Sequence, residues 1–255
     1  MKVLNTQQGS SEWHSERANR FTASEAAAVF GQHKYMSRED LLRQKALQTE
    51  QEVSAAQHRI FDKGHEAEAA ARPIAEEIIG EELYPVTGVA NGDDRFLSSM
   101  DGLTMLEDIG FEHKSINQEL RVITSAYDLA EHYKHQMDHQ FLVSDQTERI
   151  LFVASDGTRD DFVSVWYERD EDRIKKLRAA WDQFEKDLAE YEPKEQEAKA
   201  EGATPETLPA LRIQVTGEVT DSNLAEFRHH AEAVIESINT DLATDEDFAT
   251  AEKTV

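Results

Sequence analysis

Two short apolar segments, at residues 96–103 and 109–115, constrain the fold of this chain more than any other feature. Each has the length and the apolar content of a β-strand, and the first delivers Asp101 at its end. Because successive side chains of a strand point to opposite faces, we expect Glu112 and Lys114 on the same face. The sequence therefore predicts two strands that bring two carboxylates and an ammonium together.

Two carboxylates beside an ammonium are suited to hold a hard divalent cation with a water next to it. Such a set can support metal-assisted hydrolysis of a phosphodiester. Taken alone, Asp101 before Gly102 is more typical of a turn, and Lys114 could be a solvated strand residue. The pairing of Asp101 with the strand-borne Glu112 favours a site over these alternatives.

Composition excludes several classes of protein. The 255 residues contain no cysteine, which excludes disulfides, thiolate metal sites and cysteine nucleophiles. No apolar run is long enough to cross a bilayer and no apolar leader is visible, so we expect a soluble intracellular protein without a membrane partner. The net charge of −25 argues against a generic nucleic-acid binder, although bound cations and local basic groups could still meet phosphates.

The periodicity of apolar residues predicts an α/β fold with a mixed central sheet flanked by helices. We expect the longest helix at 55–79, broken or kinked at Pro73. The further helices are expected at 22–31, from 37, at 125–142 and at 170–191, and the strands at 83–89, 96–100, 109–115, 149–155 and 161–168. The predicted inner face of the long helix consists of Ile60, Phe61, Ala67, Ala70, Ala71, Ile74 and Ile78.

The main domain is predicted to span residues 1–191. Residues 192–210 are rich in Glu, Lys, Ala and Pro and are typical of a linker. We interpret residues 211–255 as an acidic C-terminal segment or a truncated second module.

Four sequence blocks, in this order, resemble the phage lambda exonuclease family, also called YqaJ-like viral recombinases, of the PD-(D/E)xK nuclease superfamily. The resemblance spans about residues 7–190 and implies a restriction-endonuclease-like nuclease core. The blocks are EWHSER at 12–17 running into RFTAS at 20–24, GHEAE at 64–68 with Arg72, SSMDG at 98–102, and EHK at 112–114, with a looser fifth block, YKHQMDHQ, at 133–140.

The resemblance implies a role for each residue of the metal site. Asp101 and Glu112 would bind the metal together with the backbone carbonyl of His113, and Lys114 would lie beside the attacking water. Glu68, rather than the neighbouring Glu66, would be the acidic residue on the preceding helix. Gln136 would be the glutamine on the helix after the strands, and the implied cofactor is Mg²⁺, with Mn²⁺ as a substitute.

A second set of residues matches family positions that bind the 5′-terminal phosphate of a DNA end. These are Arg17, Ser24 and Ser99, whose guanidinium and hydroxyl groups suit a phosphate. The alternatives are that Ser24 only caps a helix and that Arg17 is a surface charge. The chain departs from the family pattern at Met100, which replaces the proline of the superfamily name, and at Asp138, where a second glutamine often stands.

Three histidines offer a competing signal. His132, His135 and His139 are spaced to share one helical face, a spacing that could bind zinc. Without an H-E-x-x-H motif, a polar helix face near DNA or solvent is the better interpretation.

The function implied by the resemblance is a Mg²⁺-dependent 5′→3′ exonuclease of the alkaline exonuclease type. It would degrade one strand of linear double-stranded DNA and leave a 3′ single strand for a phage single-strand annealing protein. Family members often form rings of three, so a homo-oligomer is expected, in the cytoplasm of a bacterial host. The alternatives are an endonuclease and a non-catalytic DNA-end-binding protein on the same fold.

Overall fold

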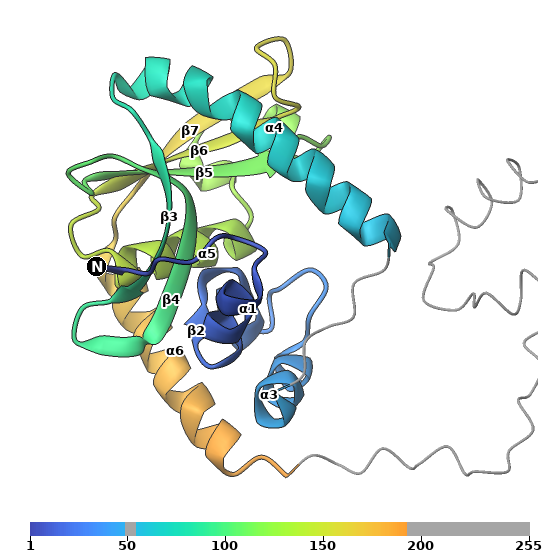
Figure 1. Ribbon diagram of the computed structural model, residues 1–255, viewed down its shortest axis with the longest axis vertical. Coiled ribbons are helices and arrows are strands. Elements are labelled where there is room, and N and C mark those ends of the chain that lie inside the picture. Colours follow the sequence, from blue (N-terminus) through green and yellow to red (C-terminus); the bar gives the residue numbers. More distant parts are fainter. Residues whose placement is uncertain (49–54, 193–255) are drawn as a thin grey trace, which may run out of the picture. The chain divides into compact units, whose positions relative to one another are not determined.

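The structure, a computed structural model, describes residues 1–48 and 55–192, which form a mixed sheet of seven strands flanked by helices (Figure 1). The predicted fold class is therefore confirmed. The strands run in the order β1-β3-β4-β5-β6-β7, with β2 beside β4, and only the β5–β6 and β2–β4 pairs among them are parallel. Their bounds are β1 Lys2–Val3, β2 Phe21–Thr22, β3 Tyr84–Ala90, β4 Asp93–Leu103, β5 Ile109–Ser115, β6 Arg149–Ser155 and β7 Phe162–Glu168.

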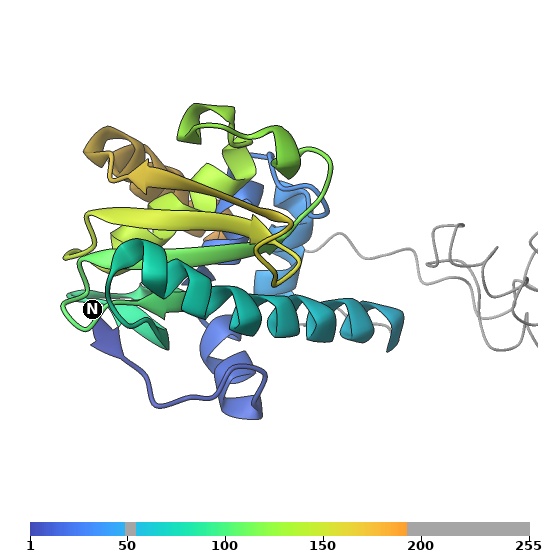
Figure 2. The same cartoon turned by 90° about the horizontal axis from the view of Figure 1, so that it is seen from above.

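Helix α4 lies on one face of strands β5 to β7, and α5 lies on the other (Figure 2). The sheet is thus a layer between helices, and both of its faces are covered in this region. The α-helices are α1 Ser11–Ala18, α2 Ala26–Val29, α3 Arg38–Leu47, α4 Ala55–Ile79, α5 Glu131–Val143 and α6 Glu171–Ala189, and the short 3₁₀ helices are η1 Ala23–Glu25, η2 Leu120–Val122 and η3 Ala126–Asp128.

Successive side chains of strand β6 pack alternately on the two faces of the sheet. Phe152 packs in the core on the α5 and α6 side, with residues such as Trp181 of α6. Its neighbours Leu151 and Val153 pack on the opposite side, against Ala71 of α4. Because both faces are buried, the sequence of this strand is a continuous apolar run rather than an alternation.

Helix α4 differs from its prediction in two ways. It runs without interruption through Pro73, so the expected break is wrong. Among its described side chains Ala71 and Ala75 are buried, whereas Phe61 and Ile78 are exposed, so the predicted inner face is right at Ala71 and wrong at Phe61 and Ile78. Small side chains let the helix approach the sheet closely, and this packing on either side of Pro73 holds the helix together although a proline removes one backbone hydrogen bond. The side chain of Ile60 lies outside the described residues.

The helix predicted at 125–142 begins later, at Glu131. Asp128 accepts hydrogen bonds from the amides of Thr124 and Ser125, which closes a separate short turn before α5. The β4 strand begins earlier than predicted, at Asp93, and continues to Leu103, the end of the segment expected at 96–103. Asp101 therefore lies within the strand and not at its end.

The predicted linker at 192–210, apart from Glu192, and the segment at 211–255 lie outside the described residues, so the domain boundaries remain a prediction. Among residues 1–48 and 55–192, no helix is both long and apolar enough to span a bilayer.

Candidate active site

Asp101 and Glu112 meet across the β4–β5 pair. The β4–β5 register pairs Gly102 with Phe111, the residues next to Asp101 and Glu112. The Asp101 Oδ2 accepts a 2.8 Å hydrogen bond from the His113 amide. Helix α4 adds Glu68, whose carboxylate pairs with Arg72 at 2.6 Å. The Nε of Arg72 in turn donates to the Asp101 carbonyl at 3.0 Å, which ties α4 to the strand that carries Asp101.

Glu112 is nearly inaccessible, with 2% of its side chain exposed, and three side chains donate to it. The Lys114 ammonium lies 2.6 Å from its Oε1, and the Gln136 amide donates to the same oxygen at 2.7 Å. The Gln140 amide donates to Oε2. A buried carboxylate is stable only when its lone pairs are used in this way.

Burial and the closeness of other carboxylates raise the pKa values of the acidic side chains in the site. Burial, followed by repulsion from the Glu112 and Glu68 carboxylates, raises the pKa of Asp101 well above its ordinary value. Burial also raises the pKa of Glu68, against the attraction of Arg72. For Lys114, burial by itself lowers the pKa, but the attraction of Glu112 and Asp101 is stronger and raises it, so the ammonium stays charged.

The oxygen atoms grouped around Asp101 and Glu112 are of the kind that binds a hard divalent cation. Among the described residues, no three His, Asp or Glu side chains form a metal-binding group. The ligands expected from the sequence include only two side chains, Asp101 and Glu112, with the carbonyl of His113 as the third. Carboxylate and carbonyl oxygens are the preferred ligands of Mg²⁺, which keeps several of its waters. The mutual repulsion that raises the pKa of Asp101 is the condition that a cation would relieve. The His113 ring bonds to Ser155 at 3.0 Å.

The three predicted phosphate ligands also lie together. The Arg17 Nη2 donates to the Ser24 hydroxyl at 2.9 Å, and the guanidinium lies over the Trp13 ring, 4.3 Å from its centroid. The Trp13 Nε1 donates to the Ser99 hydroxyl at 2.8 Å, so Trp13 bridges the set, a role that sequence reasoning missed. Thr22, not Ser24, is the N-cap of η1, so the capping alternative for Ser24 is wrong.

A buried ion pair holds the backbone around Arg17 and Ser24. The Lys45 ammonium of α3 donates to the carbonyls of Arg17 at 3.1 Å and Arg20 at 2.6 Å, and pairs with Glu25 at 2.9 Å. The other carboxylate oxygen of Glu25 accepts from the Thr22 amide at 3.0 Å. Both charged side chains are 10% exposed or less, so this clamp is an internal part of the structure.

Gln140 is the residue that sequence reasoning failed to single out. The family pattern directs attention to a second glutamine at position 138, but Gln136 and Gln140 are four residues apart, and this spacing places two side chains on one face of a helix. The Gln-x-x-x-Gln pattern was the available signal. Asp138 instead faces Tyr167 and Arg173, away from Glu112.

The histidines of α5 do not form a zinc site. His139 is fully buried and accepts a 3.1 Å hydrogen bond from the Trp181 indole. His135 bonds to Gln32 at 2.8 Å and stacks on Phe30. The interpretation of a polar face near DNA or solvent is therefore wrong for both residues.

The fold resembles those of two solved structures of one nuclease. The crystal structure of an alkaline exonuclease (LHK-Exo) from Laribacter hongkongensis is 25% identical, with a TM-score of 0.59, and the match covers 71% of this chain and 93% of that one. LHK-Exo in complex with dAMP matches with 24% identity, the same TM-score and the same coverage. The described fold is thus of the alkaline exonuclease class.

The sequence pattern of the YqaJ-like viral recombinase domain matches residues 12–147, which is over half of the chain. The chain belongs to this family, and the resemblance found in the sequence is confirmed. Comparison with curated proteins gives no match.

Proposed function

We propose that this protein is a Mg²⁺-dependent exonuclease that degrades one strand of linear double-stranded DNA in the 5′→3′ direction. The observation that carries the proposal is the cluster of Asp101, Glu112 and Lys114 at adjacent strands of a fold shared with an alkaline exonuclease. Membership of a viral recombinase family supports the same function.

In the proposed mechanism, Asp101, Glu112 and the His113 carbonyl would hold the cation, which when bound would supply Lewis-acid activation of water and phosphate. Lys114 directs its ammonium toward the attacking water and stabilises negative charge that develops on the phosphate. Gln136 keeps the Glu112 carboxylate oriented, and Glu68 adds negative charge beside Asp101. Mn²⁺, which also accepts oxygen ligands, should substitute for Mg²⁺.

The second cluster supports the 5′→3′ direction of digestion. Arg17, Ser24 and Ser99 offer a guanidinium and two hydroxyls, linked through Trp13, for a terminal 5′-phosphate. Recognition of a charged end by a fixed set of donors would favour one polarity of digestion.

The test uses end-labelled linear duplexes with either a 5′-phosphate or a 5′-hydroxyl, incubated with Mg²⁺ and then with EDTA. We expect mononucleotide release from the phosphorylated end, slower release from the hydroxyl end, and none with EDTA. Asp101→Asn should abolish cleavage while the melting temperature changes little. Lys114→Met should also abolish cleavage, and it should lower the melting temperature because the buried Glu112 loses its charged partner. Full activity in either variant would reject the mechanism, and equal rates on the two ends would reject the phosphate pocket.

A covalently closed circular duplex separates the alternatives. An exonuclease leaves it intact, whereas cutting would favour an endonuclease, and binding of ends without hydrolysis would favour a non-catalytic module.

We further propose that the 3′ strand produced serves a phage single-strand annealing protein in the cytoplasm of a bacterial host, and that the full chain forms a homo-oligomer, with a trimer expected. Family membership supports this proposal. Light scattering of the full chain reports its mass directly, and a monomer at working concentration would contradict it.

A further inference from the structure

Helix α5 carries a buried acid on the side away from the candidate metal site. Each residue of an α-helix turns by 100°, so Asp138 lies about 200° around the helix from both Gln136 and Gln140. The two glutamines donate to Glu112, while Asp138 is 1% exposed and faces β7 and α6. The helix is thus held on two opposite sides by polar contacts.

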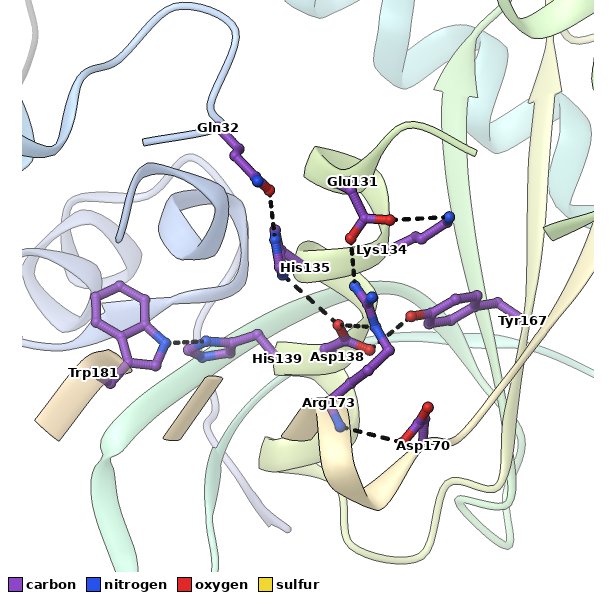
Figure 3. Close-up of polar contacts among 10 residues, drawn as sticks. All are labelled: Gln32, Glu131, Lys134, His135, Asp138, His139, Tyr167, Asp170, Arg173 and Trp181. Atoms are coloured by element: carbon purple, nitrogen blue, oxygen red, sulfur yellow. Dashed lines mark hydrogen bonds and ion pairs between the residues drawn. The ribbon is translucent and has the colours of Figure 1, made fainter. Parts of the chain in front are cut away.

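The contacts of Asp138 come from two other elements, as Figure 3 shows. The Tyr167 hydroxyl of β7 donates to its Oδ1 at 2.8 Å, and the Arg173 Nε of α6 donates to its Oδ2 at 2.9 Å. Arg173 also donates to Glu131 at 3.0 Å, at the first turn of α5. Arg173 therefore contacts α5 at two residues, the buried Asp138 and the exposed Glu131.

His135 is the remaining titratable group that faces Asp138, and it does not act as a counter-ion. Its Nδ1 lies 3.8 Å from the carboxylate, and burial lowers its pKa to about 4, so the ring is neutral at physiological pH. Its Nε2 is directed to Gln32 instead. The charge of Asp138 is thus met by Arg173.

The carboxylate of Asp138 is suited to fix the orientation of α5, because its two oxygens accept from two different elements. Burial raises the pKa of Asp138 to about 6, even though Arg173 and Tyr167 favour its ionised form. An asparagine has a similar shape but a single side-chain oxygen and no charge, so it cannot meet both donors as the carboxylate does.

We propose that Asp138 is a positioning residue, which with Arg173 and Tyr167 fixes the rotation of α5 so that Gln136 and Gln140 hold Glu112 ready for the metal. This inference rests on the proposed metal-dependent nuclease function. Partners of metal ligands typically change metal affinity by about 10- to 100-fold when removed, and Asp138 acts one step further out.

The test compares the wild type with Asp138→Asn in the full chain. We expect the Mg²⁺ concentration for half-maximal cleavage to rise about 10-fold. Without DNA, the rise in melting temperature that Mg²⁺ produces should shrink in parallel, because a ligand stabilises the folded state according to its affinity. The melting temperature without metal should fall, because Arg173 loses its buried partner, so the Mg²⁺ response is compared between the folded proteins. The preference for a 5′-phosphate should be unchanged.

Glu131→Gln is the matched control, because it removes the exposed partner of the same arginine and leaves Asp138 intact. It should match the wild type in its Mg²⁺ response. Should Asp138→Asn fail to fold, Tyr167→Phe removes a single donor to Asp138 and should shift the Mg²⁺ response in the same direction by less. An unchanged Mg²⁺ response in the folded variant, or an equal effect of Glu131→Gln, would overturn the inference. A wild type that Mg²⁺ neither activates nor stabilises would overturn the proposed function itself.

Discussion

For some single residues the sequence alone predicts a role, whereas for others the role depends on a partner that only the structure reveals. Asp101 and Glu112 can be picked out from their sequence blocks, and the structure brings their carboxylates near each other on the adjacent strands β4 and β5. Gln140 cannot be picked out in this way, because a glutamine on a helix does not indicate a role until the acceptor of its amide is known. Its acceptor, Glu112, lies 28 residues away in sequence. Only the three-dimensional fold joins the two.

Gln140→Leu tests the importance of this missed contact. The variant keeps the approximate volume but leaves the buried Glu112 carboxylate without one of its three donors. We expect a 10- to 100-fold loss of metal affinity or cleavage rate, about the effect of removing a partner of a metal ligand. Initial rates across a Mg²⁺ titration measure it. Gln146→Leu, at an exposed position, is the control, and equal behaviour of the two variants would contradict the role.

His139 makes a prediction about acid stability. Burial lowers its pKa to about 3, below the ordinary value of about 6.5 that applies in the unfolded chain. The unfolded state therefore gains a proton first as pH falls, and the free energy of unfolding decreases by up to about 1.4 kcal/mol per pH unit between pH 6.5 and 3. Asp138, with its pKa raised to about 6, acts in the opposite direction between about pH 4 and 6.

His139→Asn should flatten this dependence while it retains an acceptor for the Trp181 indole. Urea unfolding at pH 7 and pH 5 measures the slope in both proteins. We expect lower stability of the variant at pH 7, because the smaller side chain leaves a cavity, but a smaller further loss at pH 5. Parallel curves would contradict the assignment.

At the scale of elements, strands are easier to predict than helix faces. Strand β6 is buried on both sides, so its apolar run is continuous and bounded by polar residues. Helix α4 packs through alanines, which have no strong apolar signature, while its larger apolar residues Phe61 and Ile78 face solvent. The predicted start of α5 is wrong because the hydrogen bonds of Asp128 close a local turn that competes with the helix.

Gly157 tests the contact between α4 and the β6–β7 turn. It has a φ of +93°, and an added Cβ would lie 3.0 Å from the Ala70 Cβ and 3.2 Å from the Ala67 Cα. Gly92 has a φ of +77° with no atom within 4 Å, so Gly92→Ala reports the backbone strain alone. We expect Gly157→Ala to cost about 1–3 kcal/mol more than this control, from overpacking. Urea unfolding measures both, and equal losses would contradict close packing.

The Lys45–Glu25 clamp between α3 and η1 predicts an effect on end recognition. Removal of one partner would leave a buried charge and cost about 3–5 kcal/mol, so the informative variant is the neutral double replacement Lys45→Met with Glu25→Gln. The backbone of Arg17 would lose its ammonium donor, and the preference for 5′-phosphate over 5′-hydroxyl ends should fall toward unity. The Mg²⁺ requirement should be unchanged. Retention of the full preference would show that the clamp is not needed.

At the scale of the whole molecule, the chain supplies its own donors to the buried carboxylate of the candidate site, so we expect the site to form without a bound cation. The chain carries a net charge of −25, yet the buried Glu112 is met by donors from within the chain, including Lys114. Composition alone argues against a nucleic-acid partner, because it does not reveal where carboxylates can recruit a cation. The family assignment, by contrast, depends on residues 12–147, where the four sequence blocks lie, and net charge does not affect it.

Chelation should therefore separate activity from folding. With EDTA, we expect cleavage to stop while the far-ultraviolet circular dichroism spectrum stays the same and the melting temperature falls by only a few degrees, since the protein donors of Glu112 remain. Added Mg²⁺ should restore the full rate. Loss of folded structure on chelation would mean that the cation is structural.

Strand β5 has a consequence for how the protein can vary in length. Phe111 packs on the side of α4, whereas Glu112 and Lys114 are directed to the other side, where α5 supplies its amides. A single inserted residue would invert this alternation, and from that point onward the core side chains and the candidate-site side chains would exchange faces. We expect natural length changes to be confined to the exposed turn around Met105 and Leu106, while the strand itself tolerates only replacements.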